Sequence, residues 1–305
     1  MVSAGEIKQR INGIKDTKKI TDAMYMISSA KMRKALRELE DTTPYFNNIR
    51  EKIGELFHYI PKVSNRYFKV IPTEYQPHRN HGVILITSDK GMCGAYNQTA
   101  ISVCEEYMSR HPRTTVFIIG EYGRQYFISK NIPFEESFHY SAAHPNLTDA
   151  RRICADLLEY YDNEKLDEIN IIHTDFMGSK PGECKKITIL PLAQTNFYKE
   201  DAAHKHIEKE FVPSPDAVLE GIVPSCLTGY IYGCLVESFC SEQQARMNAM
   251  KSASDNADQI LKDLKVQYNK IRQAAITNEM IEISAGAMAQ RNKRRKAFEG
   301  DKSDE

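Results

Sequence analysis

The sequence predicts an α/β domain inserted between two long terminal helices that form an antiparallel coiled coil. Near both ends of the chain, apolar residues recur at intervals of three and four, which is the period of an amphipathic helix. The middle changes to short β-branched runs separated by helical segments, which is typical of a largely parallel sheet. We expect one helix over residues 1–60, an α/β domain over 75–210, a second helix over 211–290 and a disordered tail over 291–305.

The first helix is predicted to begin with a capping box formed by Ser3 and Glu6. Its apolar positions are Ile7, Ile11, Ile14, Ile20, Met24, Ile27, Leu36, Leu39, Phe46, Ile49, Ile53 and Leu56. Pro44 is expected to kink the helix or interrupt it locally. A helix of roughly 55 residues is about 80 Å long, so it needs an equally long partner.

The second helix supplies that partner. Its apolar stripe consists of Ile231, Leu235, Phe239, Met250, Ile260, Leu264, Tyr268, Ile271 and Ile283. Alanines also repeat every four residues, at Ala245, Ala249, Ala253 and Ala257. A row of small residues lets two helix backbones approach closely, although alanine also has a high helix propensity of its own. We therefore expect helix–helix packing at these four alanines.

The middle segment is predicted to fold as a Rossmann-like α/β domain. The strand candidates are "GVILIT" at 82–87, "TTVFIIG" at 114–120, "INIIHTDF" at about 170–176 and "KKITILPL" at 185–192. Between them, residues 97–110, 121–130 and 147–162 are expected to be helical. Residues 61–80 and 198–216 are interpreted as the linkers into and out of this domain.

Composition excludes several classes of protein. The formal net charge is zero, which argues against general nucleic-acid binding. Seven cysteines without a CxxC pair favour reduced thiols over a disulfide framework or a zinc site. The N-terminus lacks the apolar core of a secretory signal, and we expect no apolar run long enough to span a membrane.

The stretch "SDKGMCGAYN", residues 88–97, follows the first strand where many α/β proteins hold a phosphate. Gly91 and Gly94 fit neither GxGxxG nor a P-loop, and the sequence around Cys93 is not the GxSxG of a nucleophile elbow. The favoured interpretation is a tight corner with both glycines at positive φ. The pair His204 and His206 is expected to be solvated rather than to bind a metal. We predict no catalytic residue, cofactor or metal site.

Charge is uneven along the first helix. Residues 7–37 contain nine basic residues and two acidic ones, Asp16 and Asp22, a net charge of +7. The basic residues are Lys8, Arg10, Lys15, Lys18, Lys19, Lys31, Arg33, Lys34 and Arg37. This segment is either a solvated face or a cationic surface for an acidic partner or anionic lipid. The absence of a Trp/Phe face favours a protein partner.

Three stretches resemble one family. Residues 6–35 ("EIKQRINGIKDTKKITDAMYMISSAKMRKA") strongly resemble the opening of the γ subunit of F-type ATP synthases. Residues 88–97 resemble the middle signature of that family, and residues 235–287, beginning "LVESFCSEQQARMNAM", resemble its C-terminal signature. The matches occur in the right order and at fitting spacing over most of the chain.

The resemblance implies a non-catalytic rotor, present in one copy, that couples ion flow to ATP synthesis or hydrolysis on β subunits. The implied partners are the α, β and ε subunits and the ring of c subunits, at the cytoplasmic face of a bacterial membrane. Residue-by-residue transfer places contacts with the hexamer of α and β at Lys18, Lys19, Met24, Arg33, Lys90, Arg246, Gln273 and Thr277.

One stretch departs from the family pattern. Family members usually end just after the stretch that matches "SAGA", whereas here the chain continues with "RNKRRK" at 291–296. We expect this tail to be disordered, with a regulatory contact to the hexamer as the alternative. Two other classes remain open for the whole chain: a Rossmann-like nucleotide-binding enzyme with helical oligomerisation arms, and a coiled-coil adaptor at the membrane surface.

Overall fold

The computed structural model describes residues 4–59, 65–68, 79–178, 182–197 and 211–300, with the side chains of 58, 59 and 292–300 left out. The chain divides into two compact units, which we describe separately. One consists of residues 1–24 with 250–305, and the other of residues 25–249. Ser3 of the expected capping box lies outside the described residues.

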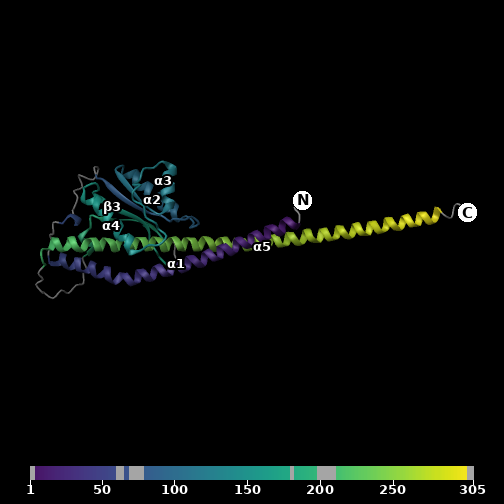
Figure 1. The fold of residues 1–305 in the computed structure, drawn as a ribbon, viewed down its shortest axis with the longest axis horizontal. Helices are drawn as coiled ribbons and strands as arrows, with labels where there is room; N and C mark the ends of the chain where they lie inside the picture. The colour runs from purple at the N-terminus through teal and green to yellow at the C-terminus, as the bar shows by residue number, and fades with distance from the viewer. Residues whose placement is uncertain (1–3, 60–64, 69–78, 179–181, 198–210, 301–305) are drawn as a thin grey trace. The chain divides into compact units, whose positions relative to one another are not determined.

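Two long helices dominate the chain, as expected (Figure 1). Helix α1 extends over Ala4–Tyr59 and helix α5 over Pro215–Gly300. Pro44 does not interrupt α1; it lies on an exposed side, where the carbonyl that loses its amide partner can be hydrated. Helix α5 continues through residues 291–300, where we expected disorder, because Lys, Arg and Ala favour helix.

In the first unit, the start of α1 packs antiparallel to part of α5. Ile7 and Ile11 form a buried cluster with Leu261 and Leu264. Further along α1 the partners lie earlier in α5: Lys18 forms an ion pair with Asp258, and the Ser254 hydroxyl donates to Asp22 at 2.7 Å. The falling partner numbers show the antiparallel direction, which confirms the predicted coiled coil.

The second unit contains a mixed sheet of four strands. These are β1 (His81–Ile86), β2 (Thr114–Ile119), β3 (Glu168–Thr174) and β4 (Cys184–Leu190). Their order is β2-β1-β3-β4; the first three are parallel, and β4 pairs antiparallel with β3. The prediction of a largely parallel sheet is confirmed.

Helices cover both faces of this sheet (Figure 1). Helices α2 (Tyr96–Arg110) and α3 (Glu121–Lys130) pack on one face, around Leu85, Ile118 and Phe127. Helix α4 (Leu147–Asp162) packs on the other, in a core that also includes Ile53 of α1 and Leu227 of α5. Short 3-10 helices at Arg66–Phe68 and Gln194–Phe197 contribute Tyr67, Phe68 and Phe197 to that core. The long helices are therefore part of the domain's own core.

Within the second unit, α1 and α5 pack closely together at a glycine. A Cβ atom on Gly229 would lie 2.4 Å from the ring of Phe46. The predicted alanine row is less deeply placed: Ala257 is buried, whereas Ala245, Ala249 and Ala253 are half-buried. Packing at these alanines stays a prediction, and Gly229 is the position that sequence periodicity did not single out.

Helix α5 is more apolar than we expected, since we predicted no apolar run long enough to span a membrane. It contains an 18-residue window with a mean hydropathy of 1.3, so by length and composition alone it satisfies the criterion for a membrane span. Half of that window is buried inside the protein. The core helix of a soluble domain meets the same criterion, because it too is apolar on several sides.

A buried polar cluster lies at the amino ends of β1 and β3. The Nδ1 atom of His81 is 2.9 Å from the Tyr107 hydroxyl, which also accepts from Asn170 Nδ2 at 3.0 Å. Asn170 Nδ2 lies 2.8 Å from Glu168 Oε1. Arg79 Nη1 lies 3.2 Å from the other Glu168 oxygen. Burial lowers the pKa of His81 and outweighs the opposing effect of Glu168, so the ring is held neutral.

Acidification is expected to destabilise the inserted domain through this cluster. Because the folded-state pKa of His81 lies below its unfolded value, stability is lost as pH falls through about 6.5, with a slope of at most about 1.4 kcal/mol per pH unit. His173, whose pKa is also lowered by burial, adds a loss of the same sign. Urea unfolding between pH 7.5 and 5 tests this.

The matched variants are His81→Asn and the same change at exposed His144. The first is expected to flatten the pH dependence of the unfolding free energy, since the asparagine amide approximates Nδ1 without titrating. The second is expected to leave that dependence unchanged. Equal effects of the two variants would contradict the role assigned to the cluster.

Candidate functional site

The loop at residues 88–97 is a tight, internally bonded corner between β1 and α2. The backbone N–H of Ser88 donates to Asn97 Oδ1 at 2.9 Å, and Asn97 Nδ2 lies 3.3 Å from Cys93 Sγ. Gly94 has the positive φ that we predicted, 59°, but the second such residue is Met92 at 62° rather than Gly91. The turn therefore points the Met92 side chain, 66% exposed, away from the core.

Cys93 has the environment of a structural thiol. It is buried, and burial raises its pKa despite the opposing effect of a contact with the Ser88 hydroxyl. A nucleophilic cysteine needs the opposite, a lowered pKa that yields thiolate at neutral pH. The structure therefore favours the interpretation of this loop as a corner rather than a catalytic turn.

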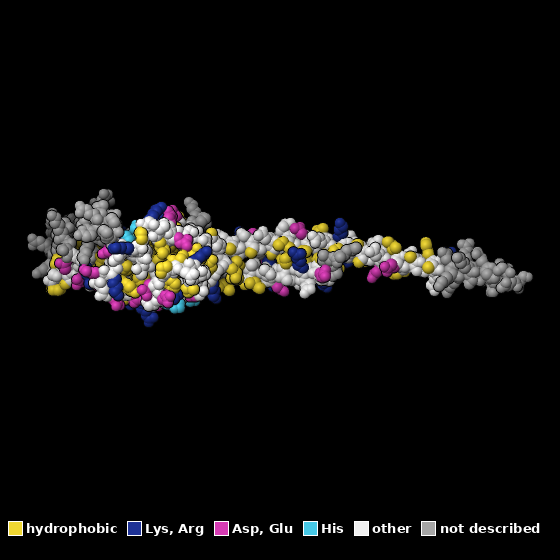
Figure 2. All heavy atoms as spheres, turned by 90° about the horizontal axis from the view of Figure 1, so that it is seen from above, with side chains coloured by type: hydrophobic (Ala, Val, Ile, Leu, Met, Phe, Trp, Pro, Cys, Tyr) yellow, Lys and Arg dark blue, Asp and Glu magenta, His cyan; other side chains and the backbone are white. Residues whose placement is uncertain are grey.

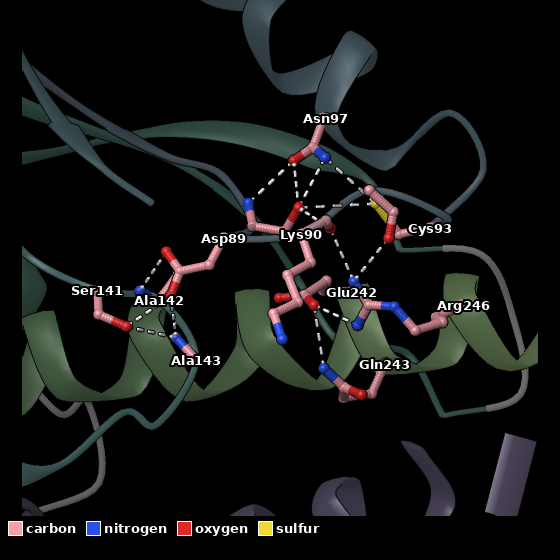
Figure 3. Close-up of polar contacts among 12 residues, drawn as sticks. Asp89, Lys90, Cys93, Asn97, Ser141, Ala142, Ala143, Glu242, Gln243 and Arg246 are labelled. Atoms are coloured by element: carbon pink, nitrogen blue, oxygen red, sulfur yellow. Dashed lines mark hydrogen bonds and ion pairs between the residues drawn. The ribbon is translucent and has the colours of Figure 1, made fainter. Parts of the chain in front are cut away.

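Asp89 fastens the loop to the inserted domain (Figure 3). Its carboxylate accepts from the Ser141 hydroxyl at 2.5 Å and from the backbone N–H groups of Ala142 at 3.2 Å, Ala143 at 3.1 Å and Glu121 at 3.0 Å. Burial alone would raise the pKa of Asp89, but these donors outweigh it and hold the pKa below the ordinary value. The carboxylate is thus an internal anchor.

Helix α5 packs against the carboxyl ends of β1 and β3. The Thr174 N–H donates to the Ser238 hydroxyl at 3.2 Å, and the Ser241 hydroxyl donates to the carbonyl of Asp175. Open α/β sheets hold nucleotides in the crevice beyond these strand ends. Here the chain's own helix occupies that place, which argues against the nucleotide-binding alternative.

Arg246 of α5 reaches the loop from the other side (Figure 3). Its Nη2 atom donates to the carbonyls of Lys90 at 2.9 Å and Gly91 at 3.1 Å. Its Nη1 atom forms an ion pair with Glu242, one helical turn earlier. Sequence reasoning assigned Arg246 to a partner and missed Glu242; the signal was present as an acidic–basic pair at i, i+4.

The predicted contact residues of α1 differ in how far they are engaged within the chain. Lys18 is paired with Asp258, and Lys19 lies 3.0 Å from Asp16 on an exposed side. Arg33 is exposed and donates to the Ser29 hydroxyl at 2.6 Å, and Met24 is half-buried. Within the described part of the chain, no acidic side chain pairs with Lys8, Arg10, Lys15 or Arg37.

The far part of α5 is an exposed helix with apolar side chains. The last residues of α5 in the cluster with α1 are Tyr268 and Ile271. Beyond them Gln273 and Thr277 are exposed, and so are Ile276, Met280, Ile281, Ile283 and Met288. Figure 2 shows hydrophobic side chains on the surface of this segment. Apolar side chains in such number indicate a surface that a partner covers.

The residues that the structure describes contain no cluster of three or more His, Cys, Asp or Glu side chains able to hold a metal ion. The predicted solvated pair His204 and His206 lies outside them. Two long helices that pack antiparallel, one of them with an exposed apolar end, and an α/β domain whose strand ends are covered by α5 are the features of a coiled-coil protein with an inserted domain.

Comparison with known proteins identifies the family to which this chain belongs. The family model described as ATP synthase matches residues 3–289. The ATP synthase gamma chain of Caldanaerobacter subterraneus subsp. tengcongensis is 35% identical over 92% of this chain and 98% of its own. That of Acetivibrio thermocellus is 34% identical over 95% and 99%. The chain belongs to the ATP synthase gamma chain family, whose members are the non-catalytic rotor of the central stalk.

A solved structure shows the same fold. A chain in the central stalk and c-ring structure of the Tetrahymena thermophila mitochondrial ATP synthase aligns with a TM-score of 0.57. It is 24% identical and covers 77% of this chain and 99% of its own length. At this identity the likeness concerns the fold alone.

Proposed function

We propose that this chain, in one copy, turns inside a hexamer of α and β subunits and binds ε and the c-ring through its inserted domain. Ion flow through the ring turns the shaft, and the shaft moves each β site through successive states. The complex sits at the cytoplasmic face of a bacterial membrane, to which this chain is peripheral. The observation that carries the proposal is the family match across nearly the whole chain.

The surfaces of the two helices support this arrangement. Exposed apolar side chains such as Ile281, Ile283 and Met288 mark a surface that a partner covers, and a sleeve of α and β subunits would cover it. The +7 charge of residues 7–37 would attract acidic segments of the surrounding subunits. The apolar end of α5 therefore suits an apolar sleeve, and the basic part of α1 suits acidic segments of the hexamer.

We place the contacts with the hexamer at the exposed or half-buried positions that the family resemblance transfers. These are Lys18, Lys19, Met24, Arg33, Lys90, Gln273 and Thr277. A shaft can shift the states of β only if it contacts those states differently. The basic excess lies on α1, whereas residues 241–290 of α5 hold six basic and six acidic residues, so turning the shaft would change which β subunit meets a positive surface.

The test is assembly and rotation. We expect the chain to co-purify with α, β and ε from the same organism, and a bead attached to the inserted domain to rotate in one direction when ATP is added. Calorimetric titration of the isolated chain with ATP is expected to show no binding. Failure to co-purify, or stoichiometric binding of ATP by the chain alone, would contradict the proposal and favour a nucleotide-binding enzyme.

A further inference from the structure

Lys90 projects from a loop whose backbone is held at two points. On one side, Asp89 is fastened to the inserted domain by four hydrogen bonds, one of them from the Ser141 hydroxyl. On the other, the carbonyls of Lys90 and Gly91 accept from the guanidinium of Arg246 on α5. The Lys90 side chain itself is exposed. The two anchors thus fix the backbone from which an exposed cation extends.

The guanidinium of Arg246 is buried inside the protein. Arg246 is 8% exposed and Glu242 is 5% exposed. Their ion pair is extended by Gln243, whose Nε2 atom lies 3.0 Å from Glu242 Oε1. A buried ion pair with satisfied hydrogen bonds holds its members in one geometry. An arginine held in this way, pointing into its own chain, is poorly placed to touch another subunit.

The loop needs this support because its local geometry is unfavourable. Gly91 and Met92 belong to neither β1 nor α2, so neither the ladder nor the helix satisfies the Gly91 carbonyl. Met92 has a φ of 62°, a conformation that residues other than glycine adopt at a cost. Arg246 supplies both carbonyls with a charged donor, which is among the stronger hydrogen bonds of a protein.

We propose that Arg246, held by Glu242, is a positioning residue that acts through the backbone of residues 90–91 and sets where Lys90 meets the hexamer. This inference rests on the proposed function, in which Lys90 is a contact. It differs from the assignment that resemblance alone suggests, because it gives Arg246 a role inside its own chain, where its bonds to Glu242, Lys90 and Gly91 lie. The Arg246–Glu242 pair also joins α5 to the loop of the inserted domain. The position of Lys90 therefore depends on the position of α5.

The experiment is a double-mutant cycle in the assembled complex of α, β and this chain with the membrane sector. Arg246→Lys keeps the charge but replaces the planar fork, which binds Glu242 through Nη1 and the two carbonyls through Nη2, by a single nitrogen on a shorter reach. We expect it to lower ATP-driven ion pumping per ATP hydrolysed by about tenfold, the size of one charged hydrogen bond. Lys90→Ala is expected to lower it as well, and the double variant no further than Lys90→Ala alone.

Additive losses would overturn the inference, because they would mean that Arg246 acts independently of Lys90. Unchanged ion pumping per ATP in the Lys90→Ala complex would overturn it too. The rotor function itself would still be supported by co-purification and rotation. The control is Gln244→Ala, on the same helix, whose side chain donates to Asn248 Oδ1 at 3.1 Å on an exposed side of the helix. It is expected to pump normally.

Hydrogen exchange gives a readout that does not depend on pumping. In the assembled Arg246→Lys complex, the backbone amides of residues 91–94 are expected to exchange at least several-fold faster, while those of β1 stay as in the wild type. Uniformly faster exchange throughout the domain would indicate general destabilisation. Unchanged exchange in the loop would show that Arg246 does not hold it. Either result would overturn the positioning role.

Discussion

Reversing the charges of Lys18 and Lys19 together is expected to uncouple ATP hydrolysis from ion pumping. The double change to glutamate lowers the net charge of residues 7–37 by four, from +7 to +3, and makes an attractive surface repel acidic segments of the hexamer. ATP-driven acidification of inverted vesicles, divided by the rate of ATP hydrolysis, measures the coupling. We expect this ratio to fall by about an order of magnitude, as for the loss of a 1.4 kcal/mol preference.

The ion pair of Lys18 with Asp258 requires a control, because Lys18→Glu also sets two carboxylates against each other between the paired helices. Adding Asp258→Lys restores the opposite charges within the chain while keeping a glutamate at position 18. If coupling returns in the triple variant, the defect came from the helix pair. If it stays low, the defect lies at the outer surface. Unchanged coupling in the double variant would refute the predicted contact.

Replacing Gly120 by alanine is expected to destabilise the inserted domain by about 3 kcal/mol or more. Gly120 follows β2 with a φ of 96°, and an added Cβ atom would lie 2.3 Å from the carbonyl oxygen of Thr87. Backbone strain in this region costs about 1–3 kcal/mol, and forcing an extra carbon against a fixed backbone costs about as much again. Hydrogen exchange of the β1 and β2 amides measures the loss directly.

Gly94→Ala is the matched control for this prediction. Gly94 also has a positive φ, 59°, but no atom lies within 4 Å of the position its Cβ would take. It should cost only the conformational penalty, about 1 kcal/mol. If the two variants were equally stable, the close contact with Thr87 would have no energetic weight, and the strand-to-helix junction would be looser than the structure indicates.

Much of the architecture could be predicted from local pattern. The period of the apolar residues placed both long helices, and the β-branched runs placed all four strands. The end of α5 was misplaced because residues beyond the usual end of the family were interpreted as a disordered terminal tail, whereas their Lys, Arg and Ala residues are good helix formers. The antiparallel edge strand β4 was not distinguished from the others, since a strand's sequence does not state its direction.

The candidate site was predictable only in part. Resemblance named Lys90 and Arg246 as members of one functional region, yet these residues lie far apart in the chain. That the guanidinium of Arg246 points at the Lys90 carbonyl depends on how α5 crosses the carboxyl ends of the strands. Glu242 was missed because a buried ion pair and an exposed one have the same sequence spacing.

The sequence by itself determined the elements of this protein, their order and the family to which it belongs, because periodicity and motif spacing are local properties of a chain. Only the tertiary structure decided that Gly229 of α5 packs closely against Phe46 of α1, and that α5 covers the strand ends of its own sheet. It also decided that Arg246 faces inward. These features depend on which surfaces meet, and that is set by packing among residues distant in sequence.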